Sequence, residues 1–415
     1  MEENTPNEHS FWLCLKPEVY YVRKQNRVLL YNTETGDCKQ SDDSAAVAFL
    51  EKLYSRENPG SILVTDYPSV SKSVPVFIQE CISDGLIDSE PFAESKKRPV
   101  RLAPILNLQR DIDKIKQEPG RSLGEDVFCY LSDVTLIINS DCTCNCPSCK
   151  NYCHQFAHCG NHHSSTEMHL DTIRLLFNQT MSIPLRRLLV TGGNIMAHSR
   201  WEEISHFFTK NGICPTLGIH YRNITSEDIG RLQDFPLLVF VDAPFDKTKM
   251  TDVAEKLQTS NTRYQFSVAS SKEYNEIVKF VEKRNIKSSI VVPFYTGNNR
   301  TFFDEQVFVQ ESDILSGPIT QQLIFARQKM NTNFFGKMMI FPNGDVKSNI
   351  NGTILGNINQ QHLIKMVEKE LSSTNFWRHT RTDSPCCNCL FQFLCPSPSN
   401  YEFVMHKNNL CHVEK

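Results

Sequence analysis

Eleven of the sixteen cysteines stand in two short segments, and this clustering limits the possible folds more than any other feature. Six lie in 142–159 and five in 386–411. The start, MEENTPNEHS, is acidic and polar and lacks the layout of a secretory signal, so we expect a cytoplasmic protein. Because cysteines in a reducing compartment seldom form disulfides, each cluster is expected to hold metal. The scattered cysteines are expected to be small buried residues: Cys14, Cys38, Cys81, Cys129 and Cys214.

Composition excludes two broad classes of partner. The net charge of −3 gives no general attraction to nucleic acid or to an anionic membrane. No uninterrupted apolar stretch is long enough to span a bilayer. The 415 residues, of which 40% are hydrophobic, suggest two or three folded domains at roughly 150 residues each.

The first 90 residues predict a winged helix-turn-helix. FWLCL, VYYV and VLLYN are short runs of aromatic and branched residues, typical of strands. Residues 42–55 and 74–84 carry their apolar side chains on one helical face, and LIDS follows as a wing-like strand. The second helix has Gln79, Glu80 and Asp84 but no Lys or Arg, so DNA is not the expected partner.

The rest of the chain divides into a linker, an α/β domain and a cysteine-rich end. Residues 91–127 are polar and broken by prolines, as in a linker. Strand and helix patterns alternate over 128–310, which predicts a mainly parallel sheet in a partial (β/α) barrel. In such folds chemistry gathers at the carboxyl ends of the strands, where the first cysteine cluster and Thr191-Gly192-Gly193 both stand. Within 311–415, MMIFPNGDV predicts a hairpin with an Asn-Gly turn.

The first cluster contains the pattern C-x3-C-x2-C, formed by Cys142, Cys146 and Cys149, at the end of a strand. Thiolates at this spacing suit zinc or an iron–sulfur cluster, and the spacing does not choose between them. Three thiolates on a four-iron cluster leave one iron open. A structural site would take a fourth ligand from another neighbour: Cys144, Cys153, His154, His158, His162 or His163.

The second cluster predicts a closed metal site. Cys386, Cys389, Cys395 and Cys411 provide four thiolates, enough for a tetrahedral zinc or a fully ligated cluster. The adjacent Cys387 is expected to be a bystander.

Together these segments resemble the radical-SAM/SPASM family of peptide maturases. In that family C-x3-C-x2-C holds a [4Fe–4S] cluster whose open iron binds S-adenosylmethionine, which one-electron reduction then cleaves. The resemblance implies that Cys142, Cys146 and Cys149 hold this cluster. It places the cofactor against Thr191, Gly192, Gly193 and Asn194. The C-terminal cysteines resemble the SPASM extension, which implies that Cys386, Cys389, Cys395 and Cys411 hold an auxiliary [4Fe–4S] cluster.

Two strings narrow the resemblance. CLFQFLCPSPSNYE and NLCHV are similar to the pseudo-radical-SAM proteins of the GG-bacteroidales peptide system and to the related grasp-with-SPASM maturases. The N-terminal part resembles the winged-helix element that recognises leader peptides of ribosomally made natural products. The implied partner is a precursor peptide whose leader adds a strand beside VLLYN and rests on the helix bearing Phe77. A charge at Leu30 or Phe77 would then weaken peptide binding.

The chain departs from the family at the cofactor pocket. Asn194-Ile195 stands where the family usually has Glu-Pro, which removes an acceptor for the cofactor ammonium. Losing such a charge-assisted hydrogen bond costs about 1.5–3 kcal/mol, roughly tenfold or more in affinity. Ser148 replaces a common aromatic residue, and NTNFFGK and DVKSN lack the cysteines of a first SPASM cluster.

Three functions therefore remain open. The first is an enzyme that cleaves S-adenosylmethionine reductively and modifies a peptide. The second is a degenerate relative that captures the precursor peptide and presents it to an active radical-SAM partner. The third is a scaffold whose cysteines hold zinc. No catalytic acid, base or radical relay can be assigned from the sequence.

Overall fold

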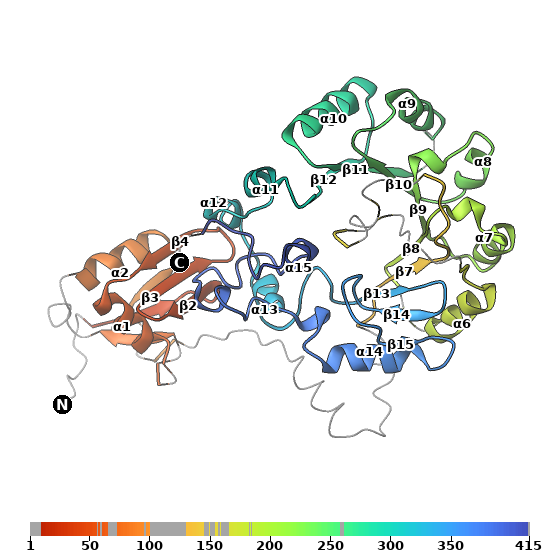
Figure 1. Cartoon of the computed structure of the whole chain (residues 1–415). Helices are drawn as coiled ribbons and strands as arrows, with labels where there is room; N and C mark the ends of the chain where they lie inside the picture. Colours follow the sequence, from red (N-terminus) through yellow and green to blue (C-terminus); the bar gives the residue numbers. More distant parts are fainter. Residues whose placement is uncertain are drawn as a thin grey trace.

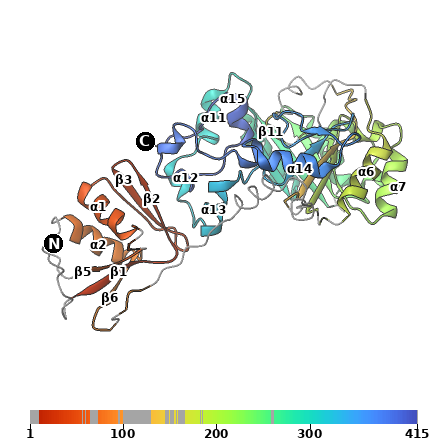
Figure 2. The ribbon, with the colours of Figure 1, turned by 90° about the horizontal axis from the view of Figure 1, so that it is seen from below.

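The computed structural model describes the following residues: 10–55, 57–58, 60–64, 73–94, 97–99, 130–144, 149, 154–156, 158, 166–181, 183, 185–257 and 261–413. Most of the expected linker, 91–127, and one expected metal ligand, Cys146, lie outside them. Figure 1 shows an N-terminal module at one end, a curved sheet at the other, and the C-terminal segment between them. Figure 2 shows the same order from below.

The N-terminal module consists of two small antiparallel sheets and two helices. One sheet has the order β5-β1-β6 and the other β2-β3-β4. Its core joins Leu13, Leu30, Leu50 and Phe77. The predicted order of strands, helix, helix and wing strand is present, whereas the short polar strand β4 was not predicted. The elements are β1 (Phe11–Leu15), β2 (Val19–Lys24), β3 (Arg27–Asn32), β4 (Cys38–Ser41), α1 (Ser44–Leu53), β5 (Ser61–Val64), α2 (Ser73–Ser83) and β6 (Ile87–Pro91).

Six parallel strands form the main part of the large sheet, in the same order as in the chain. They are β7 (Asp133–Ile137), β8 (Arg187–Thr191), β9 (Thr216–His220), β10 (Leu237–Asp242), β11 (Thr262–Val268) and β12 (Ser289–Pro293). The helices lie on the outer side of the curve (Figure 1). They are α6 (Leu170–Thr180), α7 (Trp201–Lys210), α8 (Ile229–Leu232), α9 (Lys247–Lys256) and α10 (Ser271–Arg284). The predicted mixed α/β fold with a mainly parallel sheet is confirmed.

Local sequence explains these elements directly. The run LLVFV of β10 is largely buried, as expected for a strand covered on both faces. In α7 the buried residues Trp201, Ile204 and Phe208 recur at helical spacing. Ser270 caps the first turn of α10, and Asn285 ends that helix in the left-handed conformation.

The large sheet continues past the boundary that the sequence predicted near residue 310. β13 (Lys337–Ile340) pairs in parallel with β7, and β14 (Asp345–Lys347) and β15 (Gly356–Asn357) follow antiparallel. The predicted Asn-Gly hairpin is the β13–β14 connection, with Gly344 at a positive φ of 87°. The first part of the expected C-terminal domain therefore completes the sheet instead of forming a separate core.

The remaining helices of the C-terminal part are α11 (Arg300–Gln306), α12 (Glu311–Ile314), α13 (Gln321–Lys329), α14 (Leu363–Ser372) and α15 (Asn400–Met405). α14 packs on the large sheet, whereas the other four lie between that sheet and the N-terminal module (Figures 1 and 2). Short 3₁₀ turns are η2 (Ile195–Ala197), η3 (Tyr221–Asn223), η4 (Phe376–Arg378) and η5 (Cys386–Asn388). Among the described residues, no helix has both the length and the apolar character needed to cross a membrane.

Candidate functional site

The carboxyl ends of four neighbouring strands bring together the chemistry-bearing residues of the large sheet. The loop after β7 carries Cys142, β8 ends at Thr191, β9 at His220 and β10 at Asp242. Because these strands are parallel neighbours, their carboxyl ends share one edge of the sheet. The predicted meeting of the cysteine loop and the glycine turn at this edge is therefore present.

The glycine turn and the cysteine loop are packed backbone to backbone. Gly193 N donates to Asn139 O at 3.1 Å, and Asn194 N donates to Asp141 O at 2.6 Å. A Cβ on Gly192 would collide with the side-chain and carbonyl oxygens of Asn139, and one on Gly193 with the carbonyl of Asp141. Both positions therefore need glycine because of close backbone approach, and the turn fixes where the cysteine loop begins.

Asn194, predicted to help bind the cofactor, is engaged with its own neighbours. Its side-chain Oδ1 accepts from Met196 N at 3.2 Å and caps η2. Its carbonyl accepts from Asn139 Nδ2 at 2.7 Å. In this conformation the side-chain oxygen satisfies a backbone donor, so Asn194 serves as the cap of η2.

Asn223, which the sequence did not single out, joins the cysteine loop to the glycine turn. Its Nδ2 donates to Gly193 O at 3.1 Å and lies 3.5 Å from Cys142 Sγ. Its Oδ1 lies 2.7 Å from Cys144 Sγ. The contact links residues about eighty positions apart, and its local signal is only that the residue follows β9.

The first predicted metal site is described only in part. Cys142, Cys144 and Cys149 are half-buried, whereas Cys146 lies outside the described residues. Burial, followed by the neighbouring Cys142 thiol, raises the pKa of Cys144 to about 11, although Arg222 and Lys249 act against this. The soft thiol donors suit zinc or iron in kind. The side chains of Cys144 and Cys142 interact. Cys144 therefore remains a candidate for the fourth ligand of a structural metal site.

A buried group of two histidines and one aspartate lies behind the same edge. His158 Nε2 is 3.2 Å from Asp242 Oδ1, and His220 Nε2 is 3.5 Å from Asp242 Oδ2. Burial favours protonation of Asp242, but the hydrogen bond with His158 and the nearby imidazole of His220 outweigh it and hold the pKa of Asp242 below the ordinary value. Burial lowers the pKa of His220. No feature of the local sequence connects these three residues, which come from three separate segments.

The inner side of the curved sheet encloses a cavity of about 680 Å³. Most of its lining residues stand at the starts of the strands, among them Asp133 of β7, Arg187 of β8 and Thr216 of β9. Thr191, at the end of β8, and His158 line its other end. The cavity therefore runs along the inside of the sheet up to the segment of His158, and it is large enough for a small molecule or a few peptide residues.

The four cysteines of the second predicted metal site line one common pocket: Cys386, Cys389, Cys395 and Cys411. Burial raises the pKa of Cys395 to about 11, and the nearby Arg381 opposes this. Among the residues that the structure describes, no three His, Cys, Asp or Glu side chains converge closely enough to hold a single ion. The four thiols are soft donors of the kind that suits zinc or an iron–sulfur cluster.

The two predicted peptide-binding residues are both core residues of the N-terminal module. Leu30 is fully buried, and Phe77 is 8% exposed. β3, which carries Leu30, pairs with β2 on one side and β4 on the other, so a peptide cannot add a strand beside it. The expected docking beside VLLYN is thus corrected: within the part of the chain that the structure describes, the edge strands of this sheet are β2 and β4, and the sequence pattern did not reveal β4.

The edge of β4 lies beside helix α2. Lys39 Nζ on β4 is 2.7 Å from Glu80 Oε2 and 3.9 Å from Asp84 Oδ2. Val76, one helical turn before Glu80, is 59% exposed. The strand edge therefore borders a helix face that combines an exposed apolar residue with charges.

The other face of the β2-β3-β4 sheet is attached to the second cysteine site. Leu29 and Tyr31 of β3 share a hydrophobic cluster with Leu390, Leu394 and Val413. Lys24 Nζ donates to Cys387 O at 2.7 Å and to Gln392 Oε1 at 2.6 Å. Cys387 thus has a contact through its carbonyl group, while its thiol remains without an assigned role.

No family model and no curated protein matches the sequence. Three crystal structures of SuiB from Streptococcus suis are similar in shape: SuiB bound to S-adenosylmethionine, SuiB bound to the precursor peptide SuiA, and SuiB itself. Their identities are 10%, 11% and 11%, and their TM-scores are 0.47, 0.49 and 0.48. Each match covers 96% of this chain and 98% of the SuiB chain. At these values the likeness carries nothing over to the sites of this chain, which rest on its own residues.

Proposed function

We propose that this chain is a radical-SAM/SPASM-type protein that binds the leader of a precursor peptide and cleaves S-adenosylmethionine reductively. One observation carries the proposal. The loop bearing Cys142 is packed directly on the Gly192-Gly193 turn at the carboxyl edge of a parallel sheet, whose inner side bounds a cavity of about 680 Å³. This is the arrangement that the resemblance in the sequence implies.

The first cluster would be held by Cys142, Cys146 and Cys149. A four-iron cluster bound there supplies the electron that cleaves S-adenosylmethionine. The chain's own contribution is positional. Asn223 holds the loop through Cys142 and Gly193, and the two glycines leave room for close approach of backbone and ligand. Thr191 and His158 line the neighbouring cavity, where a substrate side chain would be oriented.

The second cluster would be held by Cys386, Cys389, Cys395 and Cys411. The donor set and the shared pocket support a fully ligated cluster, with no open position for a substrate. Its place between the large sheet and the N-terminal module makes it a structural link as well.

The precursor peptide would dock on the β4 edge, next to α2. An unpaired strand edge offers backbone hydrogen bonds to an added strand, and a neighbouring helix face offers side-chain contacts. The exposed Val76 and the Lys39–Glu80 pair provide apolar and charged contacts for the peptide's side chains.

A second function is favoured by the contacts at the strand ends. The side chain of Gln155 bonds the backbone of Tyr295 in both directions, at 2.8 and 2.9 Å. Thr191 Oγ1 lies 3.5 Å from His158 O. The segment that carries Gln155 and His158 therefore lies against the ends of β8 and β12. The side chain of Asn194 caps η2. A chain with a weakened cofactor pocket would bind the precursor peptide and assist an active radical-SAM partner.

Formation of 5′-deoxyadenosine decides between the two functions. The chain is purified without oxygen, reconstituted with iron and sulfide, reduced with dithionite and given S-adenosylmethionine. We expect 5′-deoxyadenosine from the wild type and none from Cys146→Ala. Cys214→Ala is the control and should form the product, because Cys214 is exposed and not buried as the sequence predicted. Full iron loading without product would support the assisting function, and zinc at both sites would contradict the cluster chemistry altogether.

A further inference from the structure

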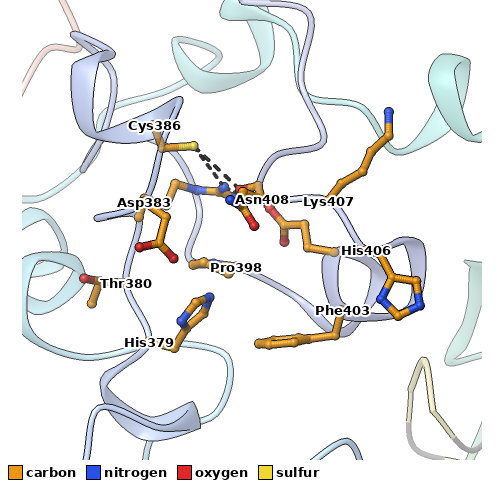
Figure 3. Close-up of a pocket in the computed structure, with 11 residues that line it drawn as sticks. His379, Thr380, Asp383, Cys386, Pro398, Phe403, His406, Lys407 and Asn408 are labelled. Carbon is orange, nitrogen blue, oxygen red and sulfur yellow. Dashed lines mark hydrogen bonds and ion pairs between the residues drawn. The ribbon is translucent and has the colours of Figure 1, made fainter.

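Arg381 lies between the second cysteine site and a neighbouring pocket of about 170 Å³ and lines both. Its side chain is only 8% exposed. Figure 3 shows this neighbouring pocket, with Cys386 on one side and His379, Phe403 and His406 on the other. A guanidinium buried at this boundary needs a partner for each of its donors.

The guanidinium is held in place by several partners. Nη1 donates to Glu402 Oε1 at 2.9 Å, and Nε donates to Pro396 O at 2.5 Å. Glu402 is fixed in turn, because it forms a capping box with Ser399 at the start of α15. Gln392 Nε2 donates to Arg381 O at 2.6 Å, which also anchors the backbone.

The same Nη1 also reaches a cysteine sulfur. Its distance to Cys386 Sγ is 3.7 Å, within the range of a hydrogen bond to sulfur. Arg381 also interacts electrostatically with Cys395. The ion pair with Glu402 alone would satisfy a structural role, so the contact with sulfur is what needs a further explanation.

We propose that Arg381 is a positioning residue whose hydrogen bond to the Cys386 sulfur raises the reduction potential of a cluster held by Cys386, Cys389, Cys395 and Cys411. The inference rests on the proposed function, which supplies the cluster. Reduction adds one electron and increases the negative charge on the sulfur ligands. A donor at such a sulfur stabilises the reduced form more than the oxidised form.

The test is a reductive titration of the cluster, followed by electron paramagnetic resonance, in the full chain carrying Cys142→Ala, Cys146→Ala and Cys149→Ala. This background leaves only the second site. In Arg381→Gln combined with Glu402→Gln the net charge is unchanged and the two amides can still bond each other. We expect the midpoint potential of this variant to be more negative than that of the background protein.

Two further variants separate the sulfur contact from general charge. Arg381→Lys keeps the charge and the partner Glu402 but loses the several donors of the planar guanidinium. We therefore expect a midpoint potential between that of the background protein and that of the double variant. Lys407→Gln removes a charge from the same pocket, where Figure 3 shows the side chain directed away from Cys386. We expect it to keep the background potential.

An unchanged potential in the Arg381→Gln/Glu402→Gln variant would overturn the proposal, and so would an equal shift in Lys407→Gln. If the Arg381→Gln/Glu402→Gln variant fails to bind iron, Arg381→Lys becomes the test. Its midpoint potential must then differ from that of the background protein. If the background protein itself takes up zinc or no iron, the iron count shows that the cluster assignment has failed. The inference about Arg381 fails with it.

Discussion

Gly193 shows how closely single residues control the first site. The carbonyl of Asp141 occupies the space that a Cβ on Gly193 would need. The Gly193 carbonyl accepts a hydrogen bond from Asn223. A methyl group here must push the cysteine loop away from the sheet edge. The position of Cys142 therefore depends on a residue that has no side chain of its own.

We expect Gly193→Ala to lower the free energy of unfolding by about 1–3 kcal/mol, the usual cost of overpacking, and to reduce iron bound at the first site. Chemical denaturation and iron analysis measure these effects. Gly230→Ala is the matched control, because nothing lies within 4 Å of a Cβ there and the residue is in α8. Wild-type stability and iron content in Gly193→Ala would contradict this account of the turn.

His220 gives a prediction for the effect of pH. Burial lowers its pKa, with partial opposition from Asp242, and its Nδ1 accepts from Arg222 N at 3.3 Å. The unfolded chain, with a histidine pKa of about 6.5, binds a proton that the folded chain resists. The contribution to stability is therefore complete above that pH and is lost as the pH falls below it.

Denaturant unfolding at pH 7.5 and at pH 5.5 checks this sign. The wild type should lose stability over this interval, and His220→Gln should lose less because its side chain does not titrate. Equal losses in the two proteins would show that protonation of His220 is not coupled to folding.

Single-residue patterns predicted the positions of the cysteines and glycines but not their neighbours. Thr191, Gly192 and Cys142 follow strands in the sequence, so their shared edge could be expected from strand order. Asn223, His158 and Asp242 could not be connected this way, because their contacts cross separate βα units and leave no periodic signal. Sequence reasoning found the first contacts of the site and missed the residues that hold them.

At the scale of elements, β4 limits where a peptide could add a strand to the β2-β3-β4 sheet. The family resemblance implied docking beside β3, but the apolar residues of β3 pack on both faces and β4 covers one of its edges. The polar sequence CKQS of β4 has no alternating pattern, so only the sheet pairing reveals it. A charge at Leu30 or Phe77 would consequently disrupt the core of the module before it altered peptide binding.

We expect Val76→Glu to weaken binding of peptides beside β4 and α2 by about tenfold or more, since it places a charge among apolar contacts. The probe is a set of 20-residue peptides selected from a random display library on the wild-type chain, and titration gives their affinities. Met181→Glu, at a position 84% exposed outside the module, is the control and should bind as the wild type does. Equal affinity for Val76→Glu would place the peptide elsewhere.

For the whole molecule, the second cysteine site and the N-terminal module act as one packed unit. Leu29 and Tyr31 on one face of β3 lie against residues that surround Cys389 and Cys395. Tyr31 Oη also accepts from Ile319 N at 2.8 Å. The local stability of the β2-β3-β4 sheet should therefore depend on metal bound at a site far away in the sequence.

Hydrogen exchange of metal-loaded and metal-free wild-type chain measures this coupling. Removal of metal should speed exchange in β2 and β3 more than in the β5-β1-β6 sheet, which packs on the opposite side of the module's core. Equal rates in β3 before and after metal removal would mean that the interface persists without the metal.

A count of iron and sulfide in the reconstituted protein shows whether the chain holds two separate four-iron clusters. We expect about eight irons for the wild type. We expect about four after Cys142, Cys146 and Cys149 are changed to Ala, and about four after Cys386, Cys389 and Cys395 are changed to Ala. Zinc in place of iron, or iron that survives both sets of substitutions, would contradict this expectation.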